Sequence, residues 1–163
     1  MTDSSDSGMA PANLRVAEGA RKCGLDINIQ VMGESTRTAV EAAAACGCSV
    51  GQIVKSLVFR GVRSGKPYLL LVSGSNRVDE KGVAATLGEP LERPDAAFVR
   101  EVTGYAIGGV PPLAHAMALA AYMDKDLLQY DVVWAAAGTP RSIFPAKPSE
   151  LAKAANANVI RVA

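Results

Sequence analysis

Residues 52–73 read QIVKSLVFRGVRSGKPYLLLVS and carry the clearest strand signals of the chain. Residues 52–59 are rich in β-branched side chains and predict a strand, and residues 68–73 predict a second one. Between them, residues 61–67 combine two glycines with a proline, which is typical of a turn. A phosphate-binding loop is excluded there, because the spacing is one residue short and Pro67 replaces the required Ser or Thr. We therefore expect a β-hairpin at the centre of the fold.

The segments on either side of this hairpin carry helix signals. Thr38 and Glu41 have the spacing of a capping box and open an alanine-rich helix that stops near Gly47. Three further helices follow from capping residues and left-handed stops. They are expected over residues 14–23 between Asn13 and Gly24, over residues 80–87 between Asp79 and Gly88, and over residues 150–155 after Ser149.

The remaining segments complete one domain. Residues 130–137 and 159–162 predict strands, whereas residues 114–123 fit a helix or an extended segment equally well. Helices and strands alternate irregularly, and the chain shows neither a repeat nor a linker. We expect a single mixed α/β (α+β) domain over residues 13–163, preceded by a flexible tail over residues 1–12.

Composition narrows the class of protein. Of the 163 residues, 49% are hydrophobic and 20% are charged, which is too apolar for a disordered chain. No apolar run is long enough to cross a bilayer, and the first residues lack the basic start and apolar stretch of a signal peptide. Three cysteines fit reduced thiols, and a single histidine leaves too few ligands for a zinc site. We expect a cytoplasmic protein that binds no membrane, metal or cofactor.

The net charge of +1 is unevenly distributed along the chain. Five basic residues and no acid lie between residues 42 and 78. A basic face of this kind suits a polyanion that is held briefly and then released, although a solvated hairpin explains the charges more simply. The five residues are Lys55, Arg60, Arg63, Lys66 and Arg77.

Lys55 is the most informative of these cations, because it lies in the middle of a predicted strand. Its neighbours on both faces of that strand are mainly apolar. Burying an unpaired ammonium costs several kcal/mol, on the order of a lost buried ion pair. Either the side chain reaches an edge of the sheet, or the ammonium points into a cavity that receives anions.

A second informative stretch is TGYAIGGVPP at residues 103–112. Paired glycines let a backbone approach a ligand closely, and the prolines that follow fix the exit of the loop. Such a loop can form an oxyanion pocket, although a structural loop has a similar composition. Two other features have weaker signals: residues 73–76 are a polar turn after a strand, and His115 beside a proline turn is typical of a structural histidine.

At these residues the sequence resembles the YbaK family, the editing domains associated with prolyl-tRNA synthetase. The resemblance runs in order from about residue 14 to residue 162 and rests on four segments. They are IVKSLVF at residues 53–59, the turn at residues 73–79, TGYAIGGVPP at residues 103–112 and VVWAAAGTP at residues 132–140.

The resemblance implies a mixed, barrel-like sheet with helices packed outside. It also implies hydrolysis of the ester between a wrong amino acid and the terminal ribose of tRNA, without metal or cofactor. The family's strand lysine falls on Lys55, its Gly-x-x-x-Pro loop on residues 108–112, and its late glycine turn on residues 138–140. The residues expected to be catalytic are Lys55, Gly108 and Gly109; those expected to bind substrate are Ser56, Ser73, Asn76, Tyr105, Val110, Pro111, Pro112, Gly138 and Thr139; and those expected to bind tRNA are Arg60, Arg63 and Lys66.

Two positions depart from the alanine-specific relatives, which have Asn after the lysine and His in the late turn. Here these positions are Ser56 and Thr139. The expected substrate is therefore tRNA-Pro, or a related tRNA, that carries a small amino acid such as Ala, Cys, Ser, Thr or 2-aminobutyrate. A synthetase partner and the oligomeric state are left open. The alternative is a non-catalytic regulatory module of the same fold that binds tRNA or an amino acid.

Overall fold

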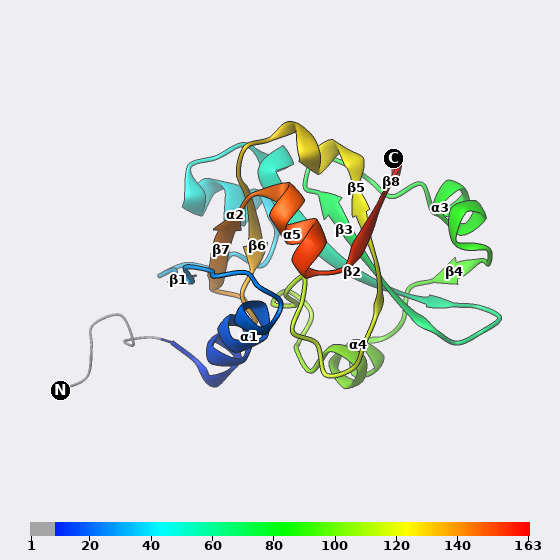
Figure 1. Cartoon of the computed structure of the whole chain (residues 1–163), viewed down its shortest axis with the longest axis horizontal. Helices are drawn as coiled ribbons and strands as arrows, with labels where there is room; N and C mark the ends of the chain where they lie inside the picture. The colour runs from blue at the N-terminus through cyan, green and yellow to red at the C-terminus, as the bar shows by residue number, and fades with distance from the viewer. Residues whose placement is uncertain (1–8) are drawn as a thin grey trace.

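The computed structural model describes residues 9–163, which form one mixed sheet with helices around it (Figure 1). No helix in this range is long and apolar enough to cross a membrane. The helices are α1 (Pro11–Lys22), α2 (Ala39–Cys46), α3 (Glu80–Leu87), α4 (Ala96–Thr103) and α5 (Pro148–Ala154). The strands are β1 (Gln30–Val31), β2 (Ile53–Gly61), β3 (Pro67–Ser73), β4 (Leu91–Glu92), β5 (Ala120–Asp124), β6 (Val133–Ala136), β7 (Ser142–Ala146) and β8 (Ala157–Ile160).

The predicted hairpin is confirmed and forms the centre of the sheet. Strands β2 and β3 pair antiparallel, with Lys55 opposite Val72. Gly65 takes a left-handed backbone conformation in the turn between them, at φ +73°, which glycine adopts without strain. The order of the sheet is β1-β7-β6-β2-β3-β5-β8, with β4 paired to β2. Strand β2 runs parallel to β6, and β3 runs parallel to β5, so the sheet is mixed as predicted.

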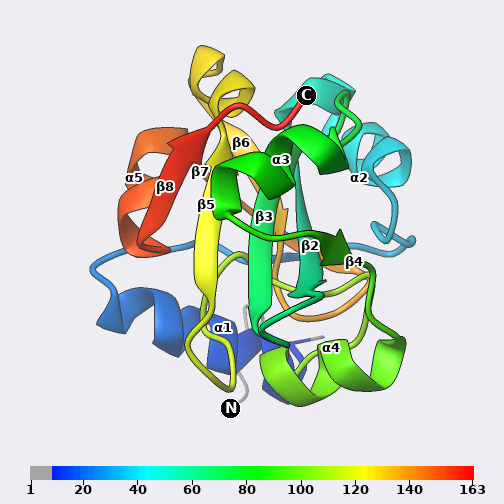
Figure 2. The same ribbon diagram turned by 90° about the vertical axis from the view of Figure 1, so that its right-hand side faces the viewer.

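Both faces of the central hairpin are buried, which explains the uninterrupted apolar run of β3. Leu69 and Leu71 point into the larger core, which α1, α4 and α5 also enter. Leu70 and Val72 point into a second core under α3, which crosses the opposite face of the sheet (Figure 2). Because neither face of β3 meets water, no alternation of apolar and polar residues is required. The predicted fold class, one mixed α/β domain with flanking helices, is therefore confirmed.

The predicted start of the first helix is wrong. Helix α1 begins at Pro11, and Asn13 lies inside it rather than at its N-cap. The Asn13 side chain is buried, and its amide donates to the Ala137 carbonyl at 2.8 Å and to the Ser142 hydroxyl at 2.7 Å. This side chain joins α1 to the β6–β7 turn, a tertiary role that local sequence does not reveal. Of the tail predicted over residues 1–12, residues 1–8 lie outside the described range, and the last two are helical.

Other boundaries follow the caps more closely. Thr38 and Glu41 form the predicted capping box, since the Glu41 backbone N–H donates to the Thr38 hydroxyl at 3.1 Å. Asp79 caps α3 as predicted. Ser149 does not cap α5, because the helix begins one residue earlier at Pro148. Residues 114–123 are extended only from Ala120 onward. Four helices and strands were not predicted from the sequence: β1, β4, α4 and β7.

Candidate functional site

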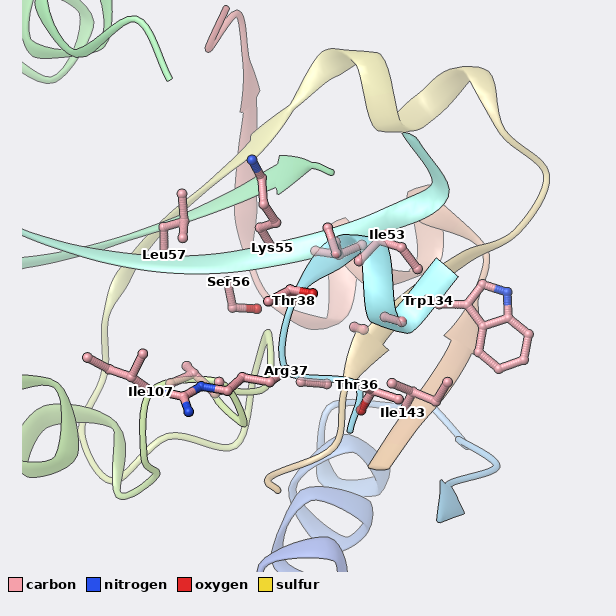
Figure 3. Close-up of a pocket in the computed structure, with 17 residues that line it drawn as sticks. Thr36, Arg37, Thr38, Ile53, Lys55, Ser56, Leu57, Ile107, Trp134 and Ile143 are labelled. Carbon is pink, nitrogen blue, oxygen red and sulfur yellow. The ribbon is translucent and has the colours of Figure 1, made fainter. Parts of the chain in front are cut away.

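A cavity of about 370 Å³ lies between β2, the start of α2, β6 and the loop at residues 104–112 that follows α4 (Figure 3). We call this loop the glycine loop. A second cavity of about 270 Å³ continues along β2. Both are lined by Ser56, Leu57, Ile107, Gly108 and Val110, so the glycine loop covers the two together. The first cavity is lined by residues 36–39, 42, 53–57, 107, 108, 110, 134–136 and 143.

Only two of the residues that line the first cavity are charged, and both are cations: Arg37 and Lys55. The other lining residues are mainly apolar, and no carboxylate or imidazole is among them. An apolar cavity with a few polar groups is the usual form of a small-molecule site. With an apolar lining, no acid and one cation, Arg37, on the Ser56 side of β2, this cavity suits a ligand that combines an apolar part with a negative charge.

Lys55 is half-buried and its ammonium is bound within the protein. The Lys55 Nζ donates to the backbone carbonyl of Asn76 at 2.6 Å. Burial lowers the pKa of Lys55, the positive charge of Arg93 lowers it further, and the carboxylate of Asp124 partly opposes the shift. The Lys55 side chain leaves β2 on the face opposite to Ser56 (Figure 3). The Lys55 ammonium is therefore held in one position by the protein and is not free in solvent.

The turn that holds Lys55 is itself held by two carboxylates. The Asn76 side-chain amide donates to Asp124 at 2.9 Å and to Asp126 at 2.8 Å. Asp124 is buried and also accepts the backbone N–H of Ser73 at 3.0 Å. The Ser73 hydroxyl donates to the Gly51 carbonyl at 2.7 Å. Ser73 and Asn76, which we expect to bind substrate, line neither of the two cavities, and the Asn76 carbonyl accepts the hydrogen bond of Lys55.

Ser56 lies on the cavity side of β2. Its hydroxyl is buried and has no hydrogen-bond partner among the described residues. In Figure 3 it lies on the same side of the strand as Arg37 and Ile107. A buried hydroxyl without a partner is rare in native proteins and is available to a ligand.

The glycine loop divides its backbone donors into two kinds. The Gly109 N–H is occupied, because it donates to the Ala106 carbonyl at 3.0 Å. The N–H groups of Gly108 and Val110 have no acceptor within residues 9–163, and Pro111 has no N–H. Gly109 has a packing role, since a Cβ atom there would lie 2.9 Å from the backbone of Thr139. The free donors of the loop are therefore those of Gly108 and Val110.

Other predicted substrate-binding residues lie behind the loop and line neither cavity. Tyr105 is buried, and its hydroxyl donates to the Ala114 carbonyl at 2.8 Å. Pro111 and Pro112 are buried as well. Gly138 packs against α1, and the Thr139 hydroxyl lies 2.6 Å from that of Ser142. These residues support the loop and the late turn from the protein side.

His115 contacts the proline turn beside it. Its Nε2 lies 2.7 Å from the Pro111 carbonyl, and burial lowers the pKa of the imidazole. It lines neither of the two cavities along β2. His115 is therefore not placed to act as a base on a ligand in the first cavity.

The basic hairpin has more internal partners than its sequence shows. Arg60 forms an ion pair with Glu92 at 2.6 Å and lies over the ring of Phe98. Lys66 lies over the ring of Tyr68 at 5.6 Å, and Arg63 and Lys66 are exposed. At about 3.3 Å per residue, the turn lies roughly 20 Å along β2 from Lys55. The hairpin turn is therefore separate from the cavity.

Sequence reasoning missed several lining residues, above all Arg37. Thr36, next to it, is buried, and its backbone N–H donates to the Pro140 carbonyl at 2.7 Å. Ile107 and Trp134 were noticed only as parts of longer stretches. Nothing local marks Arg37, because its contact with the glycine loop spans about 70 residues of chain. The described residues contain no group of three or more His, Cys, Asp or Glu side chains placed to hold a metal ion.

Comparisons with known proteins agree with this geometry. Residues 33–154 match the aminoacyl-tRNA editing domain family. The chain is 33% identical over 119 residues to the uncharacterized protein YwhH of Bacillus subtilis (strain 168), covering 73% of this chain and 75% of that protein.

Solved structures are similar over nearly the whole chain. A proposed trans-editing enzyme for prolyl-tRNA synthetase is 47% identical, with a TM-score of 0.90, covering 95% of this chain and 98% of that one. The hypothetical protein APE2540 is 32% identical, with a TM-score of 0.84, covering 91% of this chain and 98% of that one. The resemblance drawn from the sequence is confirmed.

Proposed function

The chain belongs to the aminoacyl-tRNA editing domain family, and we propose that it hydrolyses the ester bond of mischarged tRNA. The observation that carries this proposal is the cavity along β2. It combines an apolar wall, two backbone N–H groups without acceptors within residues 9–163 and the cation of Arg37, with no acid among its lining residues. Family membership supports tRNA editing in general, and the cavity supports the cleavage of an ester.

The proposed reaction needs little activation. An aminoacyl ester is already reactive, so water attacks its carbonyl carbon directly. The N–H groups of Gly108 and Val110 stabilise the oxyanion that forms, and Lys55 adds positive potential nearby. The Gly109 N–H is already bound to the Ala106 carbonyl, so we assign Gly109 to the packing of the loop against Thr139.

The protons in this reaction go to the substrate itself. The oxygen of water bonds to the carbonyl carbon, the ester C–O bond breaks, and one proton ends on the ribose oxygen that leaves. The ribose hydroxyl next to the ester transfers that proton to the leaving oxygen. This assignment agrees with a cavity lined by neither a carboxylate nor an imidazole.

We assign a small amino acid to the apolar part of the cavity. The candidates are Ala, Cys, Ser, Thr and 2-aminobutyrate on tRNA-Pro or a related tRNA. The unpartnered hydroxyl of Ser56 is available to hydrogen-bond a polar group of the bound aminoacyl end. The reaction belongs in the cytoplasm, where tRNA is charged, and it engages the acceptor end of the tRNA.

The test is a panel of tRNAs charged with each candidate amino acid, incubated with the purified protein. Correctly charged prolyl-tRNA serves as the control substrate. We expect faster release of at least one small amino acid than of proline. Binding of charged tRNA without release of any amino acid would instead support the non-catalytic module.

A further inference from the structure

The side chain of Arg37 starts from a fixed point at the edge of the cavity. The residue before it is anchored, since the Thr36 backbone N–H donates to the Pro140 carbonyl at 2.7 Å. The Arg37 backbone N–H donates to the Ser35 hydroxyl at 3.2 Å. Thr38, the next residue, caps α2. The position of the Arg37 Cα is therefore set from both sides, although its side chain is exposed.

The stem of Arg37 packs on the glycine loop. Gly108 has φ +96°, and a Cβ atom there would lie 2.7 Å from the Arg37 Cγ and 3.2 Å from its Nε. The Arg37 stem thus occupies the space that a side chain at position 108 would need. Figure 3 shows the guanidinium next to Ile107, on the side of β2 that carries Ser56. The cation therefore lies beside the glycine loop at Gly108.

The guanidinium of Arg37 forms no ion pair within residues 9–163. The pKa of Glu41 is nevertheless lowered, first by hydrogen bonds from Thr38 and then by the charge of Arg37. Three other arginines are paired with glutamates within 4.0 Å. No carboxylate within residues 9–163 lies that close to Arg37. A guanidinium that is fixed at its root and unpaired at its tip is well suited to bind a phosphate through two parallel hydrogen bonds. Lys55 is different, because it leaves the other face of β2 and is bound to Asn76.

We propose that Arg37 binds a phosphodiester of the single-stranded acceptor end while the ester lies at the glycine loop. The inference rests on the proposed function, because it takes aminoacylated tRNA as the ligand. It adds a residue that anchors the nucleic acid and leaves the chemistry to the loop. Arg37 then acts on affinity and on the placement of the ester.

The experiment compares two non-hydrolysable probes, of which only the longer one carries internucleotide phosphates and the two cytidines that they join. One is a CCA trinucleotide with alanine joined to its terminal ribose by an amide, and the other is the matching alanyl-amide of adenosine. Their dissociation constants are measured for the wild type, Arg37→Met and Arg37→Lys. Methionine keeps the stem over Gly108 without the charge, and lysine keeps the charge without the planar fork. The matched control is Arg161→Met, an exposed arginine just beyond β8.

The expected result is selective for the phosphates. Arg37→Met weakens binding of the trinucleotide by about 10-fold, the scale of a lost hydrogen bond to a charged group. The slope of log affinity against log salt falls by about 0.7 for this single-stranded probe. Arg37→Lys recovers part of the loss. Binding of the adenosine probe changes by less than about 2-fold, as does binding of either probe to Arg161→Met.

Three results would overturn the inference. In the first, Arg37→Met weakens both probes equally, which would place Arg37 at the ester itself. In the second, Arg37→Met behaves as Arg161→Met does, and in the third the wild type binds both probes with equal affinity. Failure of the proposed function looks different: the expected selectivity appears, but the wild type releases no amino acid from any charged tRNA.

Discussion

The hairpin turn and the glycine loop are both candidate functional regions in the sequence, but they lie in different parts of the structure. In the hairpin, the polar groups are largely satisfied within the chain. Arg60 pairs with Glu92, and Glu89 accepts the backbone N–H of Ser64 and the hydroxyls of Ser64 and Tyr68. Around the glycine loop, a hydroxyl, two backbone N–H groups and a guanidinium lack partners within residues 9–163. Unsatisfied bonding capacity distinguishes the candidate site better than charge or glycine content does.

The largest effect is expected when one glycine in each of the two regions is substituted. Gly109→Val places a branched side chain 2.9 Å or less from the Thr139 backbone, so the loop must move. We expect deacylation to be abolished and the melting temperature to fall. The matched variant is Gly65→Ala in the hairpin turn, where nothing lies within 4 Å of an added Cβ.

Gly65→Ala should lower stability by about 1–2 kcal/mol, because alanine is strained in the left-handed conformation. Its deacylation rate should stay within about 2-fold of wild type when assayed below its melting temperature. Both properties are measured by thermal unfolding and by release of labelled amino acid. A Gly109→Val variant with normal activity would remove the loop from the site.

The second comparison uses the two lysines of the hairpin. Lys55→Ala should lower deacylation by on the order of 10²-fold, the scale of losing one preorganised electrostatic group. The fold should survive, because the ammonium that is removed is half-buried and bound to one carbonyl. Lys66→Ala, at the exposed turn, should leave the rate within about 2-fold. Wild-type turnover by Lys55→Ala, with an unchanged circular-dichroism spectrum, would contradict the assignment.

Elements defined by local signals were predictable, and those defined by distant contacts were not. The hairpin, the Thr38 capping box and the Gly88 stop depend on neighbouring residues, and the structure contains all three. Asn13 was misassigned because its side chain bonds to residues more than 120 positions away. Strand β7 was not predicted because Pro145 interrupts its apolar pattern. Its extended conformation depends on antiparallel pairing with β6.

The candidate site shows the same division. Lys55, Ser56, Gly108 and Val110 were predicted from their types and the resemblance, and all four line the cavity. Arg37 was not, because a cation before a helix has no distinguishing local pattern. Whether each of these residues acts as proposed stays a prediction.

A smaller effect is expected from neutralising the hairpin. Replacing Arg60, Arg63 and Lys66 by glutamine should weaken binding of every tRNA about equally, since phosphate contacts do not read sequence. The slope of log affinity against log salt should fall by less than the loss of three phosphate contacts would give, because Arg60 is already paired with Glu92. The amino-acid preference should stay the same. Deacylation is measured against salt concentration with two mischarged amino acids, and a changed preference would make the hairpin part of the cavity.

The smallest effect is expected on the stability of the fold at low pH, through Glu89. Hydrogen bonds from Ser64 and Tyr68 lower the pKa of Glu89 to about 2, so the folded protein binds this proton at lower pH than the unfolded chain does. The stabilisation is present above the ordinary pKa and is lost as the pH falls toward 2. Thermal unfolding between pH 6 and pH 3 checks this, with Glu89→Gln as the control. An equally steep loss of stability in the glutamine variant would assign the acid sensitivity to other groups.

The central claim, that the ester is cleaved in the cavity beneath the glycine loop, is tested most directly by filling that cavity. Ser56→Leu places a larger side chain into both cavities along β2 without changing charge. The measurement is the single-turnover rate of release of the best small amino acid from tRNA, for this variant and for the neutralised hairpin at low salt. We expect a loss of about 10²-fold or more for Ser56→Leu, as for a misplaced substrate, and a nearly unchanged rate for the hairpin variant at saturating enzyme. An unimpaired Ser56→Leu enzyme beside an inactive hairpin variant would contradict it.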